Sequence, residues 1–535
     1  MRIRLAYVGS SISSFGVRLL GALLLRDDED VHLHFILAEN FRKLSSILFS
    51  DASSRLSSTD IERIGAELAC ADLVGLSCFS EYAGLTKDII AAIRRHNPKA
   101  FIVWGGVHPT ADPEDCIAHA DAVGIGEAEI SLPALVQRIK RNEPFLDVPG
   151  FWFRQDDAAG PATIRNAPPP LLTSEQLDLL PHPLFGEREY IFSPGDQGFR
   201  PLGAADYVQL DALSYNTMWS RGCPFKCSYC GNTRLIEIDA DYARIRHSSP
   251  EHIIAEVESI LTRFAHIKFV VFHDDCLISL PEAVLKEFSE RWRARIGLPF
   301  AVTGLTPVHI RDDKVKALLA GGLNRVRMGI QSGSDAILKF YGRPNRPGLI
   351  RQATDILGQY AKLMMPPHYD MIFDNPIETK EDIAASLRLL NDMPRPYMIN
   401  VFSLRYIPNT QLGRQLAEVS VDIEKIERDY TSVMSTFANA LMYLVALVRL
   451  PAPLFDYLLR FARPYPESVH PAWQPVILLL RAALMAKRAY FHIRWGDYSI
   501  VFGKLGLLLQ RLGLQSDVRS APNRYSGLLP RRSEP

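Results

Sequence analysis

The feature that most constrains the fold is an alternation of short apolar runs with segments of helical period, which occurs twice in this 535-residue chain. Over the first 145 residues the strand-like runs are Arg4–Val8, His32–Leu37, Leu73–Cys78, Phe101–Trp104 and Ala122–Gly124. Segments with the period of a helix lie at 15–26, 59–70, 84–96 and 129–140. Such alternation predicts an α/β fold with a doubly wound, Rossmann-like parallel sheet that has helices on both faces.

Glycine and polar residues follow these strands, where doubly wound sheets bind their ligands. The segments are Gly9–Ser11, Ser77–Glu81, Gly105–Thr110 and Gly124–Glu129. Because the carboxyl ends of parallel strands meet at one edge, we expect all four segments to line the same crevice. The paired glycines of the third segment would let a ligand approach the backbone closely.

A second alternation of strands and helices runs from about 205 to 420, and a cysteine-rich loop opens it. Cys223, Cys227 and Cys230 have the spacing C-x3-C-x2-C. Thiolates hold iron–sulfur clusters, and three ligands leave one iron of a cubane open to a small molecule. A structural zinc knuckle or a chance cluster is the alternative. Zinc sites usually take four nitrogen or sulfur ligands, commonly in paired C-x2-C units, and the sequence has no second pair.

With Arg221 and Gly222 before it and the aromatic Tyr229 inside it, this loop resembles the signature of the radical S-adenosylmethionine (SAM) superfamily. The resemblance implies a 4Fe–4S cluster on Cys223, Cys227 and Cys230, with Tyr229 as a cofactor contact. It further implies SAM bound to the open iron and a partial (β/α)6 barrel. It also implies that an electron from the cluster cleaves SAM to methionine and a 5′-deoxyadenosyl radical.

The strands expected after the loop support the barrel. They are Lys268–Phe272, Phe300–Thr303, Arg325–Ile330, Tyr369–Phe373 and Asn400–Tyr406, which make six with the strand before the loop. Two helix starts are also marked, by the hydroxyl of Ser249 before Pro250 and by a capping box from Thr379 to Asp382.

Residues at the carboxyl ends of barrel strands carry the chemistry. By resemblance, Asp274 or Asp275 would bind the SAM ammonium group, and the order of the strand leaves open which of them points inward. Gln331 and Ser332 would lie near the ribose and methionine portion, although glutamate is frequent where this chain has Gln331. Arg343 would pair with the SAM carboxylate, or would be a surface arginine.

The first region also carries a resemblance. Gly75–Cys78, Trp104–Thr110 and Gly124–Glu129 are similar to the cobalamin-binding domain that precedes many radical SAM modules. The implied cobalamin contacts are Ser77, Gly105, Gly106, His108, Gly126 and Glu127. The Asp-x-His-x-x-Gly motif, whose histidine ligates cobalt in better-known domains, is not found. His108 is therefore expected near the nucleotide tail or as a polar loop residue. A flavodoxin-like domain that binds nothing is the alternative.

Four domains are predicted: a cobalamin-binding domain at 1–145, a proline-rich linker at 146–204, a radical SAM barrel at 205–420 and a helical C-terminal domain at 421–535. Thr431–Val448 is uncharged, but its polar residues favour a buried helix over a membrane span. The tail from Arg519 is rich in serine, proline and arginine, which predicts disorder.

Composition excludes some functions. The chain has 60 basic and 60 acidic residues, so it has no electrostatic footprint for nucleic acid or for an anionic membrane. Cysteines outside the loop have apolar neighbours, which is typical of reduced thiols in a reducing compartment. The amino terminus enters a strand pattern without the apolar stretch of a signal peptide. We expect a cytoplasmic protein.

Together the resemblances imply an enzyme, a cobalamin-dependent radical SAM methyltransferase. Its substrate would be a small molecule, lipid or peptide, methylated at an unactivated carbon, and its electron donor a flavodoxin or ferredoxin. Two alternatives stay open. One is an enzyme that uses both cofactors to form or rearrange rings without methyl transfer. The other is a non-catalytic iron–sulfur and corrinoid protein for electron transfer or sensing.

Overall fold

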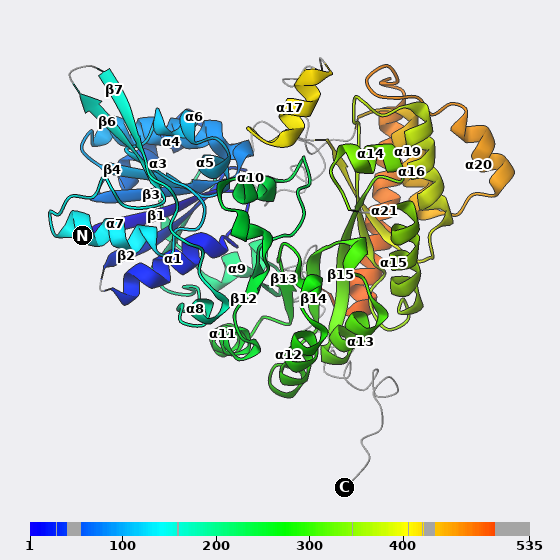
Figure 1. Ribbon diagram of the computed structural model, residues 1–535, viewed down its shortest axis with the longest axis horizontal. Coiled ribbons are helices and arrows are strands. Elements are labelled where there is room, and N and C mark those ends of the chain that lie inside the picture. Colours follow the sequence, from blue (N-terminus) through cyan, green and yellow to red (C-terminus); the bar gives the residue numbers. More distant parts are fainter. Residues whose placement is uncertain are drawn as a thin grey trace, which may run out of the picture. The chain divides into compact units, whose positions relative to one another are not determined.

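The computed structural model describes residues 1–27, 29–39, 55–157, 160–344, 346–404, 406–419, 421 and 434–497, and its elements are labelled in Figure 1. The chain forms two compact units. The first comprises Met1–Asp211 with Arg234–Tyr242 and Ser259–Phe264, and the second comprises the remainder. Each unit is described by itself.

The first unit is built on a nine-stranded sheet with the order β7-β6-β5-β4-β3-β1-β2-β8-β9. The strands are β1 (Arg2–Gly9), β2 (Asp30–Leu37), β3 (Leu73–Cys78), β4 (Phe101–Gly105), β5 (Ala122–Gly124), β6 (Phe151–Asp157), β7 (Gly160–Arg165), β8 (Glu189–Phe192) and β9 (Arg200–Pro201). Strands β5, β4, β3, β1 and β2 are parallel in the order typical of flavodoxin-like sheets. The prediction of a doubly wound sheet is confirmed.

Helices cover both faces of this sheet. They are α1 (Phe15–Arg26), α3 (Ser58–Leu68), α4 (Ala83–His96), α5 (Val107–Ala111), α6 (Pro113–Ile117), α7 (Ser131–Lys140), α8 (Ser174–Leu177) and α9 (Ala204–Leu210). Apolar residues of α3 and α4, such as Ile64 and Ile93, pack with Val8, Ile36 and Trp104 of the strands in one buried cluster. Helix α1 lies over the opposite face, where Gly21 is in contact range of Leu33. Alternating side chains of the strands thus fill two apolar layers.

Residues 146–204, predicted as a linker, supply β6 to β9 to the same sheet. Strands β6 and β7 form an antiparallel hairpin on β5, and β8 pairs in parallel with β2. A buried arginine fixes this addition. Arg18 of α1 lies between the rings of Phe35 and Phe185 and pairs with Glu189 of β8, to which Tyr207 also donates. The prolines that indicated a linker lie mostly outside these strands, at positions such as 168–170 and 181.

The second unit contains a six-stranded parallel sheet in chain order, β10-β13-β14-β15-β16-β17. The strands are β10 (Ser214–Thr217), β13 (Phe269–Phe272), β14 (Phe300–Leu305), β15 (Leu323–Gln331), β16 (His368–Phe373) and β17 (Met398–Ser403). Strands β11 (Ser220–Arg221) and β12 (Arg246–His247) form a short antiparallel ribbon. Because each strand pairs with the one before it, the sheet has the topology of the predicted six-stranded partial barrel.

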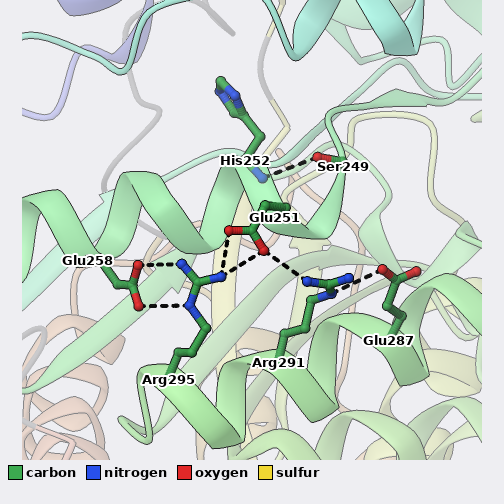
Figure 2. Close-up of polar contacts among 7 residues, drawn as sticks. All are labelled: Ser249, Glu251, His252, Glu258, Glu287, Arg291 and Arg295. Carbon is green, nitrogen blue, oxygen red and sulfur yellow. Dashed lines mark hydrogen bonds and ion pairs between the residues drawn. The ribbon is translucent and has the colours of Figure 1, made fainter.

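Helices alternate with the barrel strands. They are α10 (Gly231–Ile238), α11 (Pro250–Arg263), α12 (Glu282–Arg295), α13 (Asp312–Gly321), α14 (Asp335–Phe340), α15 (Pro347–Gln359), α16 (Lys380–Asp392) and α17 (Gln411–Glu418). Both predicted caps are present: Ser249 Oγ accepts from His252 N at 3.2 Å, and Thr379 forms a capping box with Asp382. Figure 2 shows the Ser249 cap beside ion pairs through which Arg295 joins α12 to Glu251 and Glu258 of α11.

Three helices follow the barrel among the described residues: α19 (Phe437–Leu447), α20 (Ala452–Leu459) and α21 (Trp473–Trp495). Helix α19 lies within the uncharged stretch 431–448, and eight of its residues are buried, as predicted. No helix in the described part of the chain is long and apolar enough to cross a membrane. The predicted tail from residue 519 lies outside the described residues.

Candidate functional site

The cysteine loop connects β11 to α10 at the carboxyl end of the barrel sheet. Cys223 and Cys227 are buried, Cys230 is half-buried, and all three are free thiols. The loop is held tightly, because Cys230 N donates to Cys227 O at 2.9 Å and Thr233 Oγ1 donates to the same oxygen at 2.7 Å. The three predicted ligands therefore lie on one compact turn.

Helix α14 and the residues after it hold the other side of this loop. Ser228 N donates to Tyr341 O at 2.9 Å, and the Tyr229 ring packs edge-on against the Tyr341 ring at 5.1 Å. Gly342 follows with a φ of +61°, and a Cβ there would lie 2.8 Å from Lys226 O. Only glycine accepts both the left-handed backbone and this close approach. Tyr229, predicted to contact a cofactor, is positioned by this packing.

Arg343 points at the cysteine loop. Its Nη1 donates to Cys227 Sγ at 3.4 Å, and its Nη2 donates to Gly329 O of β15 at 2.7 Å. The sequence left open whether Arg343 pairs with the SAM carboxylate or lies on the protein surface. The structure puts the guanidinium beside the sulfur of a predicted cluster ligand.

Asp274 and Asp275 follow β13 and differ in their surroundings. Asp274 is buried and accepts from Trp219 N at 3.2 Å and from both the backbone and the hydroxyl of Ser220. Burial raises the pKa of Asp274 to about 7. Asp275 accepts from Asn232 Nδ2 at 2.7 Å, on the far side of the cysteine loop. Asp274 thus holds the segment just before the cysteine loop, and Asp275 contacts the segment just after it.

Gln331 and Ser332 end β15. Gln331 has a φ of +74°, which is uncommon for a side-chain-bearing residue and is often found at functional sites. A Cβ on Gly329 would lie 2.5 Å from Gln331 Nε2 and 3.3 Å from Arg343 Nη2, so the amide and the guanidinium meet over Gly329. Ser332 is fully buried, and its hydroxyl lies 3.1 Å from Ser386 Oγ of α16.

In the first unit, the predicted glycines lie where the parallel strands end. Gly106 has a φ of +99°, and a Cβ there would lie 2.5 Å from Ser77 Oγ, so the loop after β4 closely approaches the end of β3. A Cβ on Gly105 or Gly126 would meet no atom within 4 Å. This edge is therefore open beside those two glycines, as a ligand crevice requires.

Glu127 and His108 have different surroundings. Gly126 and Glu127 line a pocket of about 430 Å³, including its open mouth, together with the proline run Pro168–Pro170. His108 is buried, with Nδ1 3.2 Å from Ser80 Oγ and its ring 5.7 Å from that of Trp104. Burial lowers the pKa of His108, which favours a neutral ring.

Two further residues lie at this site, and sequence reasoning missed the first of them. His309 lies beside the loop, with its ring 5.3 Å from that of Phe225 and its Nδ1 3.5 Å from Cys276 Sγ. Asp374 has a φ of +57° and accepts from Ser403 Oγ at 2.7 Å and from Asn439 Nδ2 at 2.7 Å. The position of Asp374 after a strand was a usable signal, whereas no local pattern marks His309.

The donor sets fit the implied cofactors. Burial raises the pKa of the Cys223 thiol and raises that of Cys230 to about 12 without a metal, whereas a bound metal deprotonates its thiol ligands. The open edge beside Gly105 and Gly126 leaves backbone accessible to a flat ligand. Both observations agree with an iron–sulfur cluster in the second unit and a large ligand on the first.

Comparison with known proteins identifies the class. The model of the radical SAM superfamily matches residues 217–390, and that of the B12 binding domain matches residues 1–136. The chain therefore carries a radical SAM domain and, before it, a B12-binding domain. Its cofactors are a 4Fe–4S cluster, SAM and cobalamin.

Individual relatives are distant. The chain is 27% identical to an uncharacterized methyltransferase of Pyrococcus horikoshii over 435 residues, 80% of this chain and 83% of that one. It is 23% identical to an anaerobic magnesium-protoporphyrin IX monomethyl ester cyclase of Synechocystis over 306 residues, 56% of each chain. Two solved structures share the fold. The methyltransferase TsrM of Kitasatospora setae gives a TM-score of 0.59 at 17% identity, covering 91% of this chain and 100% of that one. The cobalamin-dependent enzyme OxsB gives 0.59 at 14% identity, covering 99% and 84%.

Proposed function

We propose that this enzyme transfers a methyl group from SAM, by way of cobalamin, to an unactivated carbon of a small molecule, lipid or peptide. The observation that carries the proposal is the presence of both cofactor modules on one chain that aligns over 80% of its length with a protein named as a methyltransferase. In such a system the cluster and SAM together supply the hydrogen-abstracting radical, and cobalamin supplies the methyl group.

Cys223, Cys227 and Cys230 hold the cluster in this proposal. Their loop offers three thiols on one turn, so one iron stays open for SAM. Arg343 supplies a positive charge next to Cys227 Sγ, at 3.4 Å. This charge offsets part of the negative charge of a thiolate-bound cluster and favours its reduced state.

Asp275 and Gln331 are the SAM contacts that we assign from the predicted set. Asp275 lies beside Asn232, just after the last cysteine, and its carboxylate suits an ammonium group. Gln331 presents an amide over Gly329 at the end of β15. Asp274 and Ser332 act as positioning residues, because the loop entry and α16 occupy their side chains.

The first unit binds cobalamin along the edge formed by Ser77, Gly105, Gly106 and Gly126, with Glu127 at the adjoining pocket. His108 is assigned no cobalt bond, since its ring is buried against Trp104 and Ser80. A flavodoxin or ferredoxin in the cytoplasm would supply electrons to the cluster.

Product counting tests the proposal. The reconstituted enzyme is incubated with reductant, SAM and candidate substrates, and S-adenosylhomocysteine and 5′-deoxyadenosine are quantified. Methyl transfer to a carbon radical predicts equal amounts of the two products, because one SAM is spent on each step. Deoxyadenosine without S-adenosylhomocysteine would contradict methylation.

Formation of deoxyadenosine without S-adenosylhomocysteine would favour the alternative of a ring-forming enzyme. The similarity to the magnesium-protoporphyrin cyclases supports this alternative, although the chain spans only about 56% of the Synechocystis protein. SAM cleavage of either kind would argue against a non-catalytic redox or sensor protein.

A further inference from the structure

The interior face of the barrel sheet carries an unusual number of arginines. Along β15, Val326 and Ile330 belong to one buried apolar face, each at most 1% exposed. Side chains alternate on a strand, so Arg325 and Arg327 point to the opposite face, together with Gln331. Because the reacting groups of such barrels line the interior, this second face is the interior one.

A polar network crosses three adjacent strands on this face. Arg327 Nε lies 2.9 Å from both carboxylate oxygens of Asp370 on β16. Asn400 of β17 donates to Asp370 Oδ1 at 2.7 Å. Arg327 and Asn400 therefore both hold Asp370, while the Arg327 side chain remains 36% exposed.

Helix α21 adds a second guanidinium to this network. Arg488 donates to Ile399 O at 3.1 Å and to Asn400 Oδ1 at 2.6 Å, both on β17. Its Nε is buried and has no hydrogen-bond partner. Among the ion pairs of the described residues, none joins Arg488 to a carboxylate. The neighbouring Lys487 donates to Tyr397 O at 3.1 Å and to Ala446 O at 2.9 Å, and its Nζ lies 5.7 Å from the centre of the Tyr397 ring.

The charges on this face do not balance. Arg325 pairs with Asp497 at 2.7 Å, and Arg327 pairs with Asp370, whose charge also acts on Arg488, so two carboxylates are shared among three guanidiniums. The buried His368 nearby adds no charge at neutral pH, because burial lowers its pKa well below its ordinary value. An uncompensated buried guanidinium is unfavourable unless an anion meets it.

The distance from this network to the carboxyl edge of the barrel sets the expected length of the ligand that bears the anionic group. Arg327 and Gln331 are four residues apart on β15, about 13 Å along the strand. Gln331 lies at the carboxyl end, beside Arg343 and the cysteine loop. Apolar Ile372 and Phe402 lie on the interior faces of the adjoining strands, and the Phe402 ring is 5.5 Å from the Arg327 guanidinium.

We propose that Arg488 and Arg327 bind a carboxylate or phosphate at the inner end of an elongated, otherwise apolar substrate, whose far end reaches the carboxyl edge of the barrel. This inference rests on the proposed function, since it names the substrate class for the same site. The C-terminal helix α21 then belongs to the substrate site and also covers the edge of β17.

Isothermal titration of the reconstituted holoenzyme tests the inference with three probes that share an eight-carbon chain: octyl phosphate, octanoate and octyltrimethylammonium. Octyl phosphate or octanoate should bind saturably and the cation should not; whichever anion binds tighter identifies the head group. Arg488→Gln should weaken anion binding by about tenfold or more. Asn400→Asp, which places a carboxylate against Arg488, should weaken it as well. Lys487→Gln is the matched control and should leave it unchanged.

Three results would overturn the inference: no saturable binding of either anion, equal binding of the cation, or equal loss in Lys487→Gln and Arg488→Gln. SAM cleavage under dithionite is measured on the same samples. A wild type that cleaves SAM but binds neither anion would refute the inference alone, whereas absent cleavage in the wild type would refute the proposed function.

Discussion

Arg343 should set the reduction potential of the cluster. If Cys227 is an iron ligand, Arg343 Nη1, which lies 3.4 Å from Cys227 Sγ, places its charge about 6 Å from the cluster centre. At an effective dielectric constant of about 20, a unit charge at that distance contributes about 3 kcal/mol. For one electron this equals about 120 mV. A nearby cation stabilises the reduced cluster, so Arg343→Met should lower the potential by roughly that amount.

The assay is a redox titration of the reconstituted protein followed by electron paramagnetic resonance, with iron content measured in parallel. Arg346→Met removes an exposed arginine three residues away and serves as the control. Its potential should stay close to the wild-type value. An unchanged or higher potential in Arg343→Met, with full iron content, would refute the placement of this charge beside the cluster.

Three further predictions concern stability. Gly304→Ala should destabilise the barrel by about 2–3 kcal/mol in denaturant titration. The reason is that Gly304 has a φ of +71° and that a Cβ there would lie 2.1 Å from Asp274 O. Gly348→Ala is the control and should have little effect, because a Cβ on Gly348 would meet no atom within 4 Å. Burial raises the pKa of Glu256 from 4.5 to about 7, so the stability that its proton contributes is lost as pH rises between those two values. The free energy of unfolding should fall by up to about 1.4 kcal/mol per pH unit below pH 7, and Glu256→Gln should flatten this slope; an equal slope in both would refute the assignment. Arg18→Met should cost about 3–5 kcal/mol in thermal or chemical unfolding, because it strands a buried carboxylate on β8, and a loss below about 1 kcal/mol would contradict this.

The strand and helix pattern was readable from the sequence because each element has a strong local period. β3 (Leu73–Cys78), β5 (Ala122–Gly124) and α1 (Phe15–Arg26) have the predicted bounds. The strands β6 to β9 were read as a linker instead. Their segments are short or lie at sheet edges, and pairing with distant strands stabilises them more than local pattern does.

The parts of the candidate site that lie in one contiguous motif were predictable. The parts that form between residues distant in the sequence were less so. The cysteine spacing marks Cys223, Cys227 and Cys230 without any structure. The orientation of Arg343 toward Cys227 depends on the turn at Gly342, and no spacing reveals it. Arg488 lies on a helix about 160 residues beyond β15, and only the tertiary structure brings it to the interior face of the barrel.

The central claim is that one chain holds a cluster on three named cysteines and cobalamin on a separate module. Metal analysis of the anaerobically reconstituted protein tests it most directly. The wild type should hold about four irons and about one cobalt per chain, and the triple change of Cys223, Cys227 and Cys230 to alanine should lose the iron while it keeps the cobalt. Iron retained by the triple variant, or no cobalt in the wild type, would contradict the account.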